Sequence, residues 1–96
     1  MILLVEDEEA HAELERTLAS RKDADPASSY SARLMSDADL LAAKLREETE
    51  EVIEATGGDH LVWECADVIY HLMVRMRASE VSLAEVEREL RSRARR

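Results

Sequence analysis

The sequence predicts a small all-α protein, a bundle of about four helices whose core is completed by dimerisation. Apolar residues recur at helical spacing in several segments, and no segment alternates as a strand would. Helix-capping signals precede two of these segments. The chain has 96 residues, too few to bury a thick core as a lone monomer. We therefore expect one domain over residues 1–96, with an N-terminal helix and linker (1–28) before the main helices (29–96).

The first helix is expected from Glu6 to about Ser20, because its apolar residues recur on one side. These residues are Ala10, Leu14 and Leu18. Residues 21–29 are rich in Asp, Ser and Ala and contain Pro26, which indicates a linker. The segment SYSARL, which begins at Ser29, is expected to be a loop.

The next helix carries an arc of charged residues beside an apolar face. Ser36 and Asp37 both offer an N-cap, and Ser36 with Asp39 resembles a capping box. The helix is expected to run to about Thr56, before the Gly57-Gly58 pair. Its charged arc is roughly 100° wide and contains Lys44, Glu47, Glu48 and Glu51. Glu48 lies at the seam with the apolar face and should point along a helix–helix groove, although the arc could also be an ordinary solvated face.

The following helix, expected from Asp59, is apolar on nearly every side between Leu61 and Met76. Such a helix is normally buried in a bundle. Its polar exceptions fall, with His60 before them, in a stripe roughly 80° wide, made of Glu64, Asp67, His71 and Arg75. His60, beside Asp59, is expected to start the helix rather than to act as a ligand. Trp63 and Tyr70 flank this stripe and are assigned to core or dimer packing. A buried carboxylate must be paired, protonated or metal-bound, so the stripe is either a metal site or the solvent edge of a core helix.

Together the two helices present the patterns EExxE and ExxD, which supply five oxygen donors. We predict these as metal ligands: Glu47, Glu48, Glu51, Glu64 and Asp67. A set of carboxylates without histidine or cysteine suits Mg²⁺ or Mn²⁺ and does not suit zinc. The two patterns together are far more specific than either one alone.

The last helix is predicted from the capping box formed by Ser82 and Glu85, and it continues through Val86 and Leu90. Residues 91–96 are rich in arginine and are expected to fray.

Composition excludes several classes of function. The net charge of −9 argues against non-specific nucleic-acid binding. No apolar run is long enough for a membrane span, and the apolar N-terminal residues are too few for a signal peptide. The single cysteine, Cys65, lies in the apolar helix and is expected to be a reduced core residue. A cytoplasmic location is therefore expected.

Four segments resemble one family. SYSARL, KLREETEE, WECADVIYHLMV and SLAEVERELRSR match in order the phosphoribosyl-ATP pyrophosphatases of histidine biosynthesis, over about Ser29 to Arg93. EExxE followed by ExxD alone would fit the wider superfamily of MazG-like pyrophosphatases. The chain departs from the family pattern at a few positions, none of which is a predicted metal ligand. These are Ser31 for threonine, Leu45-Arg46 for the commoner Val-Gly, Cys65 for a small residue, and Glu80 in a turn often built around glycine.

The resemblance implies hydrolysis of phosphoribosyl-ATP to phosphoribosyl-AMP and pyrophosphate with Mg²⁺, for which Mn²⁺ can substitute. Glu47 or Glu48 is the candidate general base, and the sequence does not choose between them. Four side chains are candidates for substrate contact: Lys44, Arg33, Tyr30 and His71. Each has an ordinary structural alternative, and for His71 a hydrogen-bonded structural role is the stronger expectation.

Two other functions stay open on sequence alone. A MazG-like enzyme that removes noncanonical nucleoside triphosphates would share the metal helices but need a different base pocket. A non-catalytic helical dimerisation module would carry the same acids as a solvated face. If the chain acts in histidine synthesis, the cyclohydrolase activity that relatives often carry in fusion would come from a separate protein.

Overall fold

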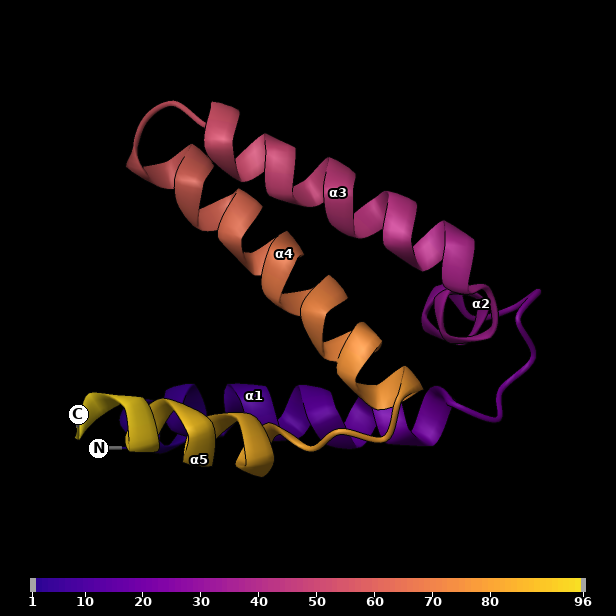
Figure 1. The fold of residues 1–96 in the computed structure, drawn as a ribbon, viewed down its shortest axis with the longest axis horizontal. Coiled ribbons are helices and arrows are strands. Elements are labelled where there is room, and N and C mark those ends of the chain that lie inside the picture. The colour runs from indigo at the N-terminus through magenta and orange to yellow at the C-terminus, as the bar shows by residue number, and fades with distance from the viewer. Residues whose placement is uncertain (1, 96) are drawn as a thin grey trace.

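The computed structural model describes residues 2–95, with side chains from Ala10 to Arg95, and in this range the chain forms five helices and no strand. The helices are α1 (Ile2–Arg21), α2 (Tyr30–Ser36), α3 (Ala38–Glu54), α4 (Gly58–Ala78) and α5 (Leu83–Ala94). Helices α3 and α4 lie side by side as an antiparallel pair (Figure 1). Helix α2 lies at the start of α3, α1 crosses the C-terminal end of α4, and α5 runs alongside α1. The all-α prediction is confirmed.

Helix α1 begins at Ile2, earlier than the predicted start at Glu6, and ends at Arg21. Leu18 is buried and Leu14 packs against the core, as predicted, but Ala10 is exposed. Only the C-terminal half of α1 lies under α4, which explains the difference along its length (Figure 1).

The expected loop at SYSARL is wrong, because this segment forms helix α2. The Ser29 hydroxyl caps the helix by accepting a hydrogen bond from the Ala32 N–H at 3.2 Å. Ala32 and Leu34 are buried and anchor the helix to the rest of the chain. Seven residues are only two turns, too few for an apolar period to be visible in the sequence.

Of the two predicted caps of α3, Asp37 is the correct one. Its carboxylate accepts a hydrogen bond from the Leu40 N–H at 3.0 Å. Ser36 is instead the last residue of α2, and its hydroxyl donates to the Arg33 carbonyl oxygen. The presence of α2 therefore removes Ser36 from the role of cap.

The connection between α3 and α4 is one residue longer than the Gly57-Gly58 pair that the sequence predicted. Helix α3 ends at Glu54, and α4 begins at Gly58 after Gly57, whose φ of 81° lies in the region that favours glycine. The two helices are therefore joined by only three residues, which holds the end of α3 close to the start of α4.

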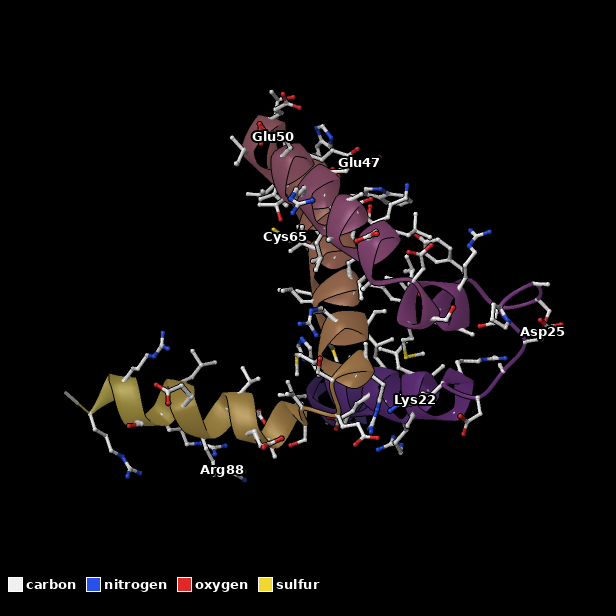
Figure 2. All side chains as sticks on the ribbon, turned by 45° about the vertical axis from the view of Figure 1, so that its right-hand side comes forward. Lys22, Asp25, Glu47, Glu50, Cys65 and Arg88 are labelled. Atoms are coloured by element: carbon white, nitrogen blue, oxygen red, sulfur yellow. The ribbon has the colours of Figure 1, made fainter. Side chains whose placement is uncertain are left out.

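The apolar core lies at the opposite end of this pair, where α1, α2, the start of α3 and the end of α4 meet. It consists of Leu18, Leu34, Leu41, Met73 and Val74. Figure 2 shows the separation: Glu47 and Glu50 lie toward the α3–α4 connection, whereas Lys22 lies at the end where α1 meets α4. The core fixes one end of the pair and leaves the other end for polar side chains.

The capping box of α5 is confirmed: the Glu85 N–H donates to Ser82 Oγ, and the Ser82 N–H donates to Glu85 Oε2. The carboxylate of Glu15 accepts a hydrogen bond from the Leu83 N–H at 2.6 Å, which joins α5 to α1. The expected fraying from Arg91 onward is wrong for the described residues, because the helix continues to Ala94. Arg96 lies outside the described residues.

Helix α4 is less buried than its apolar sequence predicts. Several of its large apolar side chains are exposed, with Val62 and Trp63 at 71% and 70%. The prediction that Trp63 packs in the core is therefore wrong within one chain, because α3 covers only one side of α4. The alternative, that Trp63 packs against a second copy in a dimer, stays a prediction. Within residues 2–95, no helix is long and apolar enough to cross a membrane.

Candidate metal centre

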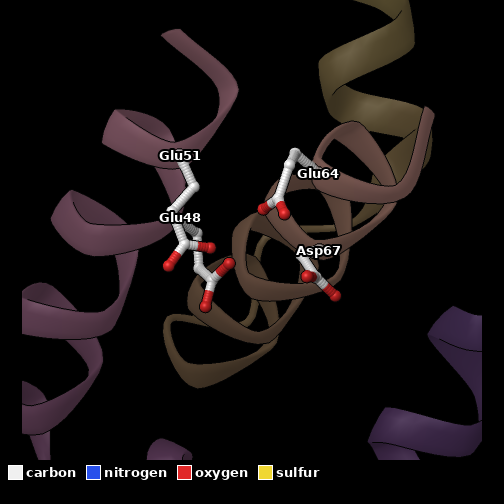
Figure 3. A group of neighbouring side chains, drawn as sticks. All are labelled: Glu48, Glu51, Glu64 and Asp67. Atoms are coloured by element: carbon white, nitrogen blue, oxygen red, sulfur yellow. The ribbon is translucent and has the colours of Figure 1, made fainter. Parts of the chain in front are cut away.

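Four of the five predicted metal ligands come together between α3 and α4. Glu48 and Glu51 project from α3 toward Glu64 and Asp67 on α4 (Figure 3). Each offers one carboxylate oxygen, and these oxygens all lie within 4.8 Å of one another. We call these four residues the acid cluster. A cavity of about 460 Å³ between α2, α3 and the end of α4 contains none of them, so it is separate from the acid cluster.

The helical register explains why these four side chains meet. Residues three apart lie on the same face of a helix, so Glu48 pairs with Glu51 on α3, and Glu64 pairs with Asp67 on α4. The antiparallel packing of α3 against α4 then opposes the two faces near the short connection. The prediction that Glu48 points along the groove agrees with its position, since its Oε2 is buried and has no hydrogen-bond partner among the residues whose side chains are described.

Glu64 is the most deeply placed acid, with only 8% of its surface exposed. Its Oε2 is buried and, within the described part of the chain, has no hydrogen-bond partner. A carboxylate oxygen in such a place costs free energy unless a proton or cation satisfies it. Glu64 therefore supplies the observation that distinguishes the acid cluster from a solvated acidic surface.

The electrostatics of the metal-free protein agree with this view. Burial raises the pKa of Glu48 above its usual value, and the negative charges of Glu51 and Asp67 raise it further. Burial also raises the pKa of Glu64, and the neighbouring Glu51 carboxyl adds to the rise. Like charges held close together disfavour ionisation. A divalent cation among these oxygens would remove that repulsion, and a set of four carboxylates fits Mg²⁺ or Mn²⁺.

Glu47, the fifth predicted ligand, lies outside the acid cluster. Its side chain is 55% exposed and its Oε2 lies 3.5 Å from Lys44 Nζ. Its role as ligand or general base stays a prediction. The i,i+3 pair with Lys44 also places a cation beside the acid cluster on the same helix.

His71 is buried, with 5% of its surface exposed, and both of its ring nitrogens have partners. Nδ1 lies 2.7 Å from the Asp67 carbonyl oxygen, which can only accept, so this nitrogen carries the hydrogen. Nε2 then accepts a hydrogen bond from the Tyr30 hydroxyl at 3.1 Å. This arrangement agrees with the structural role that the sequence favoured for His71, and substrate contact by His71 stays untested.

Tyr30 and Arg33 lie on α2 at the edge of this network. The Arg33 guanidinium stands 5.4 Å from the centre of the Tyr30 ring, and the Tyr30 and Tyr70 rings stack with centroids 6.3 Å apart. A Tyr70–Ser31 hydrogen bond between hydroxyls also joins α2 to α4. Partial burial raises the pKa of Tyr30, and the nearby Lys44 ammonium opposes the rise. The Arg33 and Lys44 cations therefore both lie near the Tyr30 side chain.

His60 is the residue of this region whose contacts the sequence did not predict. It was expected to begin the helix rather than to act as a ligand, and its Nδ1 accepts a hydrogen bond from the Thr56 N–H at 3.2 Å. Its Nε2 lies 3.4 Å from Glu64 Oε1. The i,i+4 spacing of His60 and Glu64 was the available signal.

A family model described as phosphoribosyl-ATP pyrophosphohydrolase matches residues 11–94. The chain belongs to this family. It is 49% identical to a phosphoribosyl-ATP pyrophosphatase of Dinoroseobacter shibae, across 85% of this chain and 84% of that protein. A protein of the same name from Jannaschia sp. is 47% identical, across 84% and 83%.

The phosphoribosyl-ATP pyrophosphohydrolase family also includes parts of larger proteins. The bifunctional histidine-biosynthesis protein of Schizosaccharomyces pombe is 46% identical over 81% of this chain. This chain spans only 19% of the length of that relative, and 10% of a trifunctional histidine-biosynthesis protein of Kluyveromyces lactis. The family match includes the whole acid cluster. Arg46, a departure from the family pattern, is exposed on α3 and does not disturb its packing.

Proposed function

We propose that this chain hydrolyses phosphoribosyl-ATP to phosphoribosyl-AMP and pyrophosphate, the second step of histidine biosynthesis. The observation that carries the proposal is the acid cluster, which lies in the part of the chain that matches the phosphoribosyl-ATP pyrophosphohydrolase family. Two helices bring four carboxylates together there, and Oε2 of Glu64 is buried without a hydrogen-bond partner among the described residues. The relatives of similar length bear the name of this activity.

Mg²⁺ is the proposed cofactor, and Mn²⁺ is expected to substitute for it. Glu48, Glu51, Glu64 and Asp67 would hold the ion, with Glu47 as a further candidate ligand from the same helix. A bound divalent ion would neutralise phosphate charge and orient the triphosphate chain. Without such an ion, a polyanionic substrate would be repelled by an acidic groove, so the metal is an essential part of the proposal.

The chain's own residues would supply the remaining functions. Glu47 is exposed and Glu48 borders the groove, so either carboxylate can take a proton from an attacking water. Lys44 and Arg33 can bind phosphate oxygens as cations. Tyr30 presents a partly exposed ring between Arg33 and His71 and is placed to contact the substrate ribose or a phosphate.

The proposed assembly is a homodimer. Apolar side chains that one chain leaves exposed recur along α4 and at the end of α3: Ile53, Leu61, Val62, Ile69 and Leu72. A patch of this kind on a short chain favours contact with a second copy. A cytoplasmic location and the absence of nucleic-acid partners stay predictions from the sequence.

The experiment that tests the activity is pyrophosphate release from phosphoribosyl-ATP and from a panel of nucleoside triphosphates, each with Mg²⁺. Turnover of phosphoribosyl-ATP with little turnover of the panel is expected. Turnover of the deoxynucleoside triphosphates with none of phosphoribosyl-ATP would instead identify a house-cleaning pyrophosphatase. No turnover of any substrate, together with no Mn²⁺ binding at millimolar concentration, would leave the non-catalytic module.

The experiment that tests the dimer is sedimentation of Val62→Glu beside wild type. The new charge on the exposed α4 surface should convert a dimer to a monomer. Leu90→Glu is the matched control, because Leu90 is also exposed but lies on α5. A monomeric wild-type protein would contradict the proposed assembly.

A further inference from the structure

We infer that His60 is a positioning residue for the metal centre. The His60 ring holds the Glu64 carboxylate through one oxygen and leaves the other oxygen for the cation. The inference rests on the proposed function, since it requires a divalent ion at the acid cluster. His60 lies four residues before Glu64 on α4, so the ring and the carboxylate share one face of the helix.

The hydrogen on the His60 ring is placed by its neighbours. The Thr56 N–H donates to Nδ1 at 3.2 Å, so Nδ1 must present its lone pair. A neutral imidazole then carries its hydrogen on Nε2. Nε2 lies 3.4 Å from Glu64 Oε1, a close polar contact that falls short of a hydrogen bond. The backbone of the α3–α4 connection thereby selects the tautomer that can donate to Glu64.

The two carboxylate oxygens of Glu64 therefore have different surroundings. Oε1 faces the imidazole, whereas Oε2 is buried without a hydrogen-bond partner among the described residues. Carboxylate ligands in metal sites are commonly held by a second hydrogen bond, which fixes their orientation and tunes the metal. His60 is the side chain placed to supply such a bond, with Nε2 3.4 Å from Oε1, and Oε2 is the oxygen that it would leave for a cation.

The same ring also connects the two helices. Thr56 belongs to the short connection after α3, and His60 lies in the first turn of α4. Glu51 lies in the last turn of α3 and Glu64 in the second turn of α4, so this connection sets how the two acids oppose each other. The apolar core lies at the other end of the pair and cannot fix this geometry.

Direct metal ligation by His60 does not fit these contacts. One ring nitrogen accepts the Thr56 N–H, and the other carries the ring hydrogen and lies 3.4 Å from Glu64 Oε1, so neither nitrogen has a free lone pair. A purely local role in the connection is the remaining alternative. In that case the contact of His60 with Thr56 would matter and the contact with Glu64 would not.

Two substitutions separate these roles, because each keeps one contact. The amide oxygen of His60→Asn falls near the position of Nδ1 and can accept from Thr56, but the side chain is too short for Glu64. The amide nitrogen of His60→Gln falls near the position of Nε2 and can donate to Glu64. His60→Ala removes both contacts, and His11→Ala is the control, since His11 is an exposed histidine on α1.

The measurement is calorimetric titration of each full-length variant with Mn²⁺ alone, with thermal unfolding in chelator as the check on folding. We expect His60→Ala and His60→Asn to bind Mn²⁺ about tenfold more weakly than wild type, the lower end of the usual effect of such a partner. His60→Gln should stay close to wild type. In turnover assays, His60→Ala should need about tenfold more Mg²⁺, with the KM for substrate unchanged at saturating Mg²⁺.

Each other outcome overturns the inference. Wild-type affinity in His60→Ala would show that Glu64 needs no positioning partner. Retention of Mn²⁺ binding in His60→Asn with its loss in His60→Gln would assign the ring to the connection alone. Absence of Mn²⁺ binding by the wild-type protein would contradict the metal centre itself, and with it the proposed function, whereas the first two results would leave the proposed function intact.

Discussion

The two ends of the α3–α4 pair differ in the side chains that they bury: one end is apolar and the other is acidic. At one end, Leu34, Leu41 and Val74 are almost fully buried in an apolar core. At the other end, the acid cluster packs carboxylates against one another beside a three-residue connection. Apolar burial stabilises the first end, while like charges destabilise the second in the absence of a cation. The stability of the fold and the chemistry of the site are therefore separated along one pair of helices, and substitutions at the two ends should have separate effects.

The largest effect is expected from Asp67→Asn, which removes one ligand charge without changing the side-chain shape. Hydrolysis should fall by about 1,000-fold, equivalent to roughly 4 kcal/mol in the barrier. The free energy of unfolding in chelator should stay the same or increase, because repulsion with Glu48 is relieved. Pyrophosphate release and urea unfolding measure the two quantities.

Glu50→Gln is the matched control for Asp67→Asn, since Glu50 is an exposed acid of α3 outside the acid cluster. It should leave hydrolysis unchanged. If Asp67→Asn unfolded the protein while Glu50→Gln did not, the acids would be structural and the separation between the two ends would be wrong.

The second-largest effect is expected on the free energy of unfolding, from a substitution at the apolar end of the pair. Leu34 is fully buried in the core, so Leu34→Ala should lower the free energy of unfolding by about 3 kcal/mol through lost burial and a residual cavity. Turnover per folded molecule should change little. Urea unfolding and active-site titration of the folded fraction would measure this, with the exposed Leu90→Ala as control. A proportionate loss of kcat in folded Leu34→Ala would show that the two ends are coupled.

Features of the two ends could be predicted from the sequence where they depend on residues that are close together in the chain. Glu64 and Asp67 were found because acids on an otherwise apolar helix are costly, and the Ser82–Glu85 capping box was found because it depends on four consecutive residues. Helix α2 was missed because two turns show no period, although Ser29 was available as its N-cap. The contact of His60 with Thr56 could not be predicted, because it depends on the path of the connection.

Exposure was the other quantity that the sequence could not supply. Trp63 and Val62 were expected to be packed because their helix is apolar on nearly every side, yet within the described chain only α1, α2 and α3 pack against α4 and leave these two side chains exposed. Apolar periodicity tells which residues need partners, and it does not tell whether those partners belong to the same chain.

A smaller effect concerns the pH dependence of stability in chelator. The folded-state pKa of Glu48 is raised above its unfolded value, so the folded protein binds more protons and loses stability as pH rises from about 4.5 through that raised pKa. Glu48→Gln should therefore stabilise the metal-free protein at pH 7 and lose this advantage near pH 4. Thermal unfolding in chelator at several pH values measures the difference. Saturating Mg²⁺ should reverse the sign at pH 7; an advantage that is equal at both pH values would contradict the raised pKa.

The smallest expected effect is at the turn after α4, where Glu80 has a φ of 58°. Its N–H bonds to the Arg77 carbonyl, and the Val81 N–H bonds to the Met76 carbonyl, a pattern that ends helices with a left-handed residue, usually glycine. The left-handed region costs a non-glycine residue roughly 1 kcal/mol. The Lys22 ammonium, 2.8 Å from Glu80 Oε1, partly offsets this cost and lowers the pKa of Glu80.

Glu80→Gly should raise the Tm by a few degrees, because the relief of backbone strain exceeds the loss of an exposed ion pair. Lys22→Ala, which removes the ion pair alone, should lower the Tm slightly, so the two variants separate the two contributions. Neither should change Mn²⁺ affinity, since the turn lies at the apolar end of α4, far from the acid cluster. A lower Tm for Glu80→Gly would mean that the Lys22 contact, rather than the backbone, determines stability at this turn.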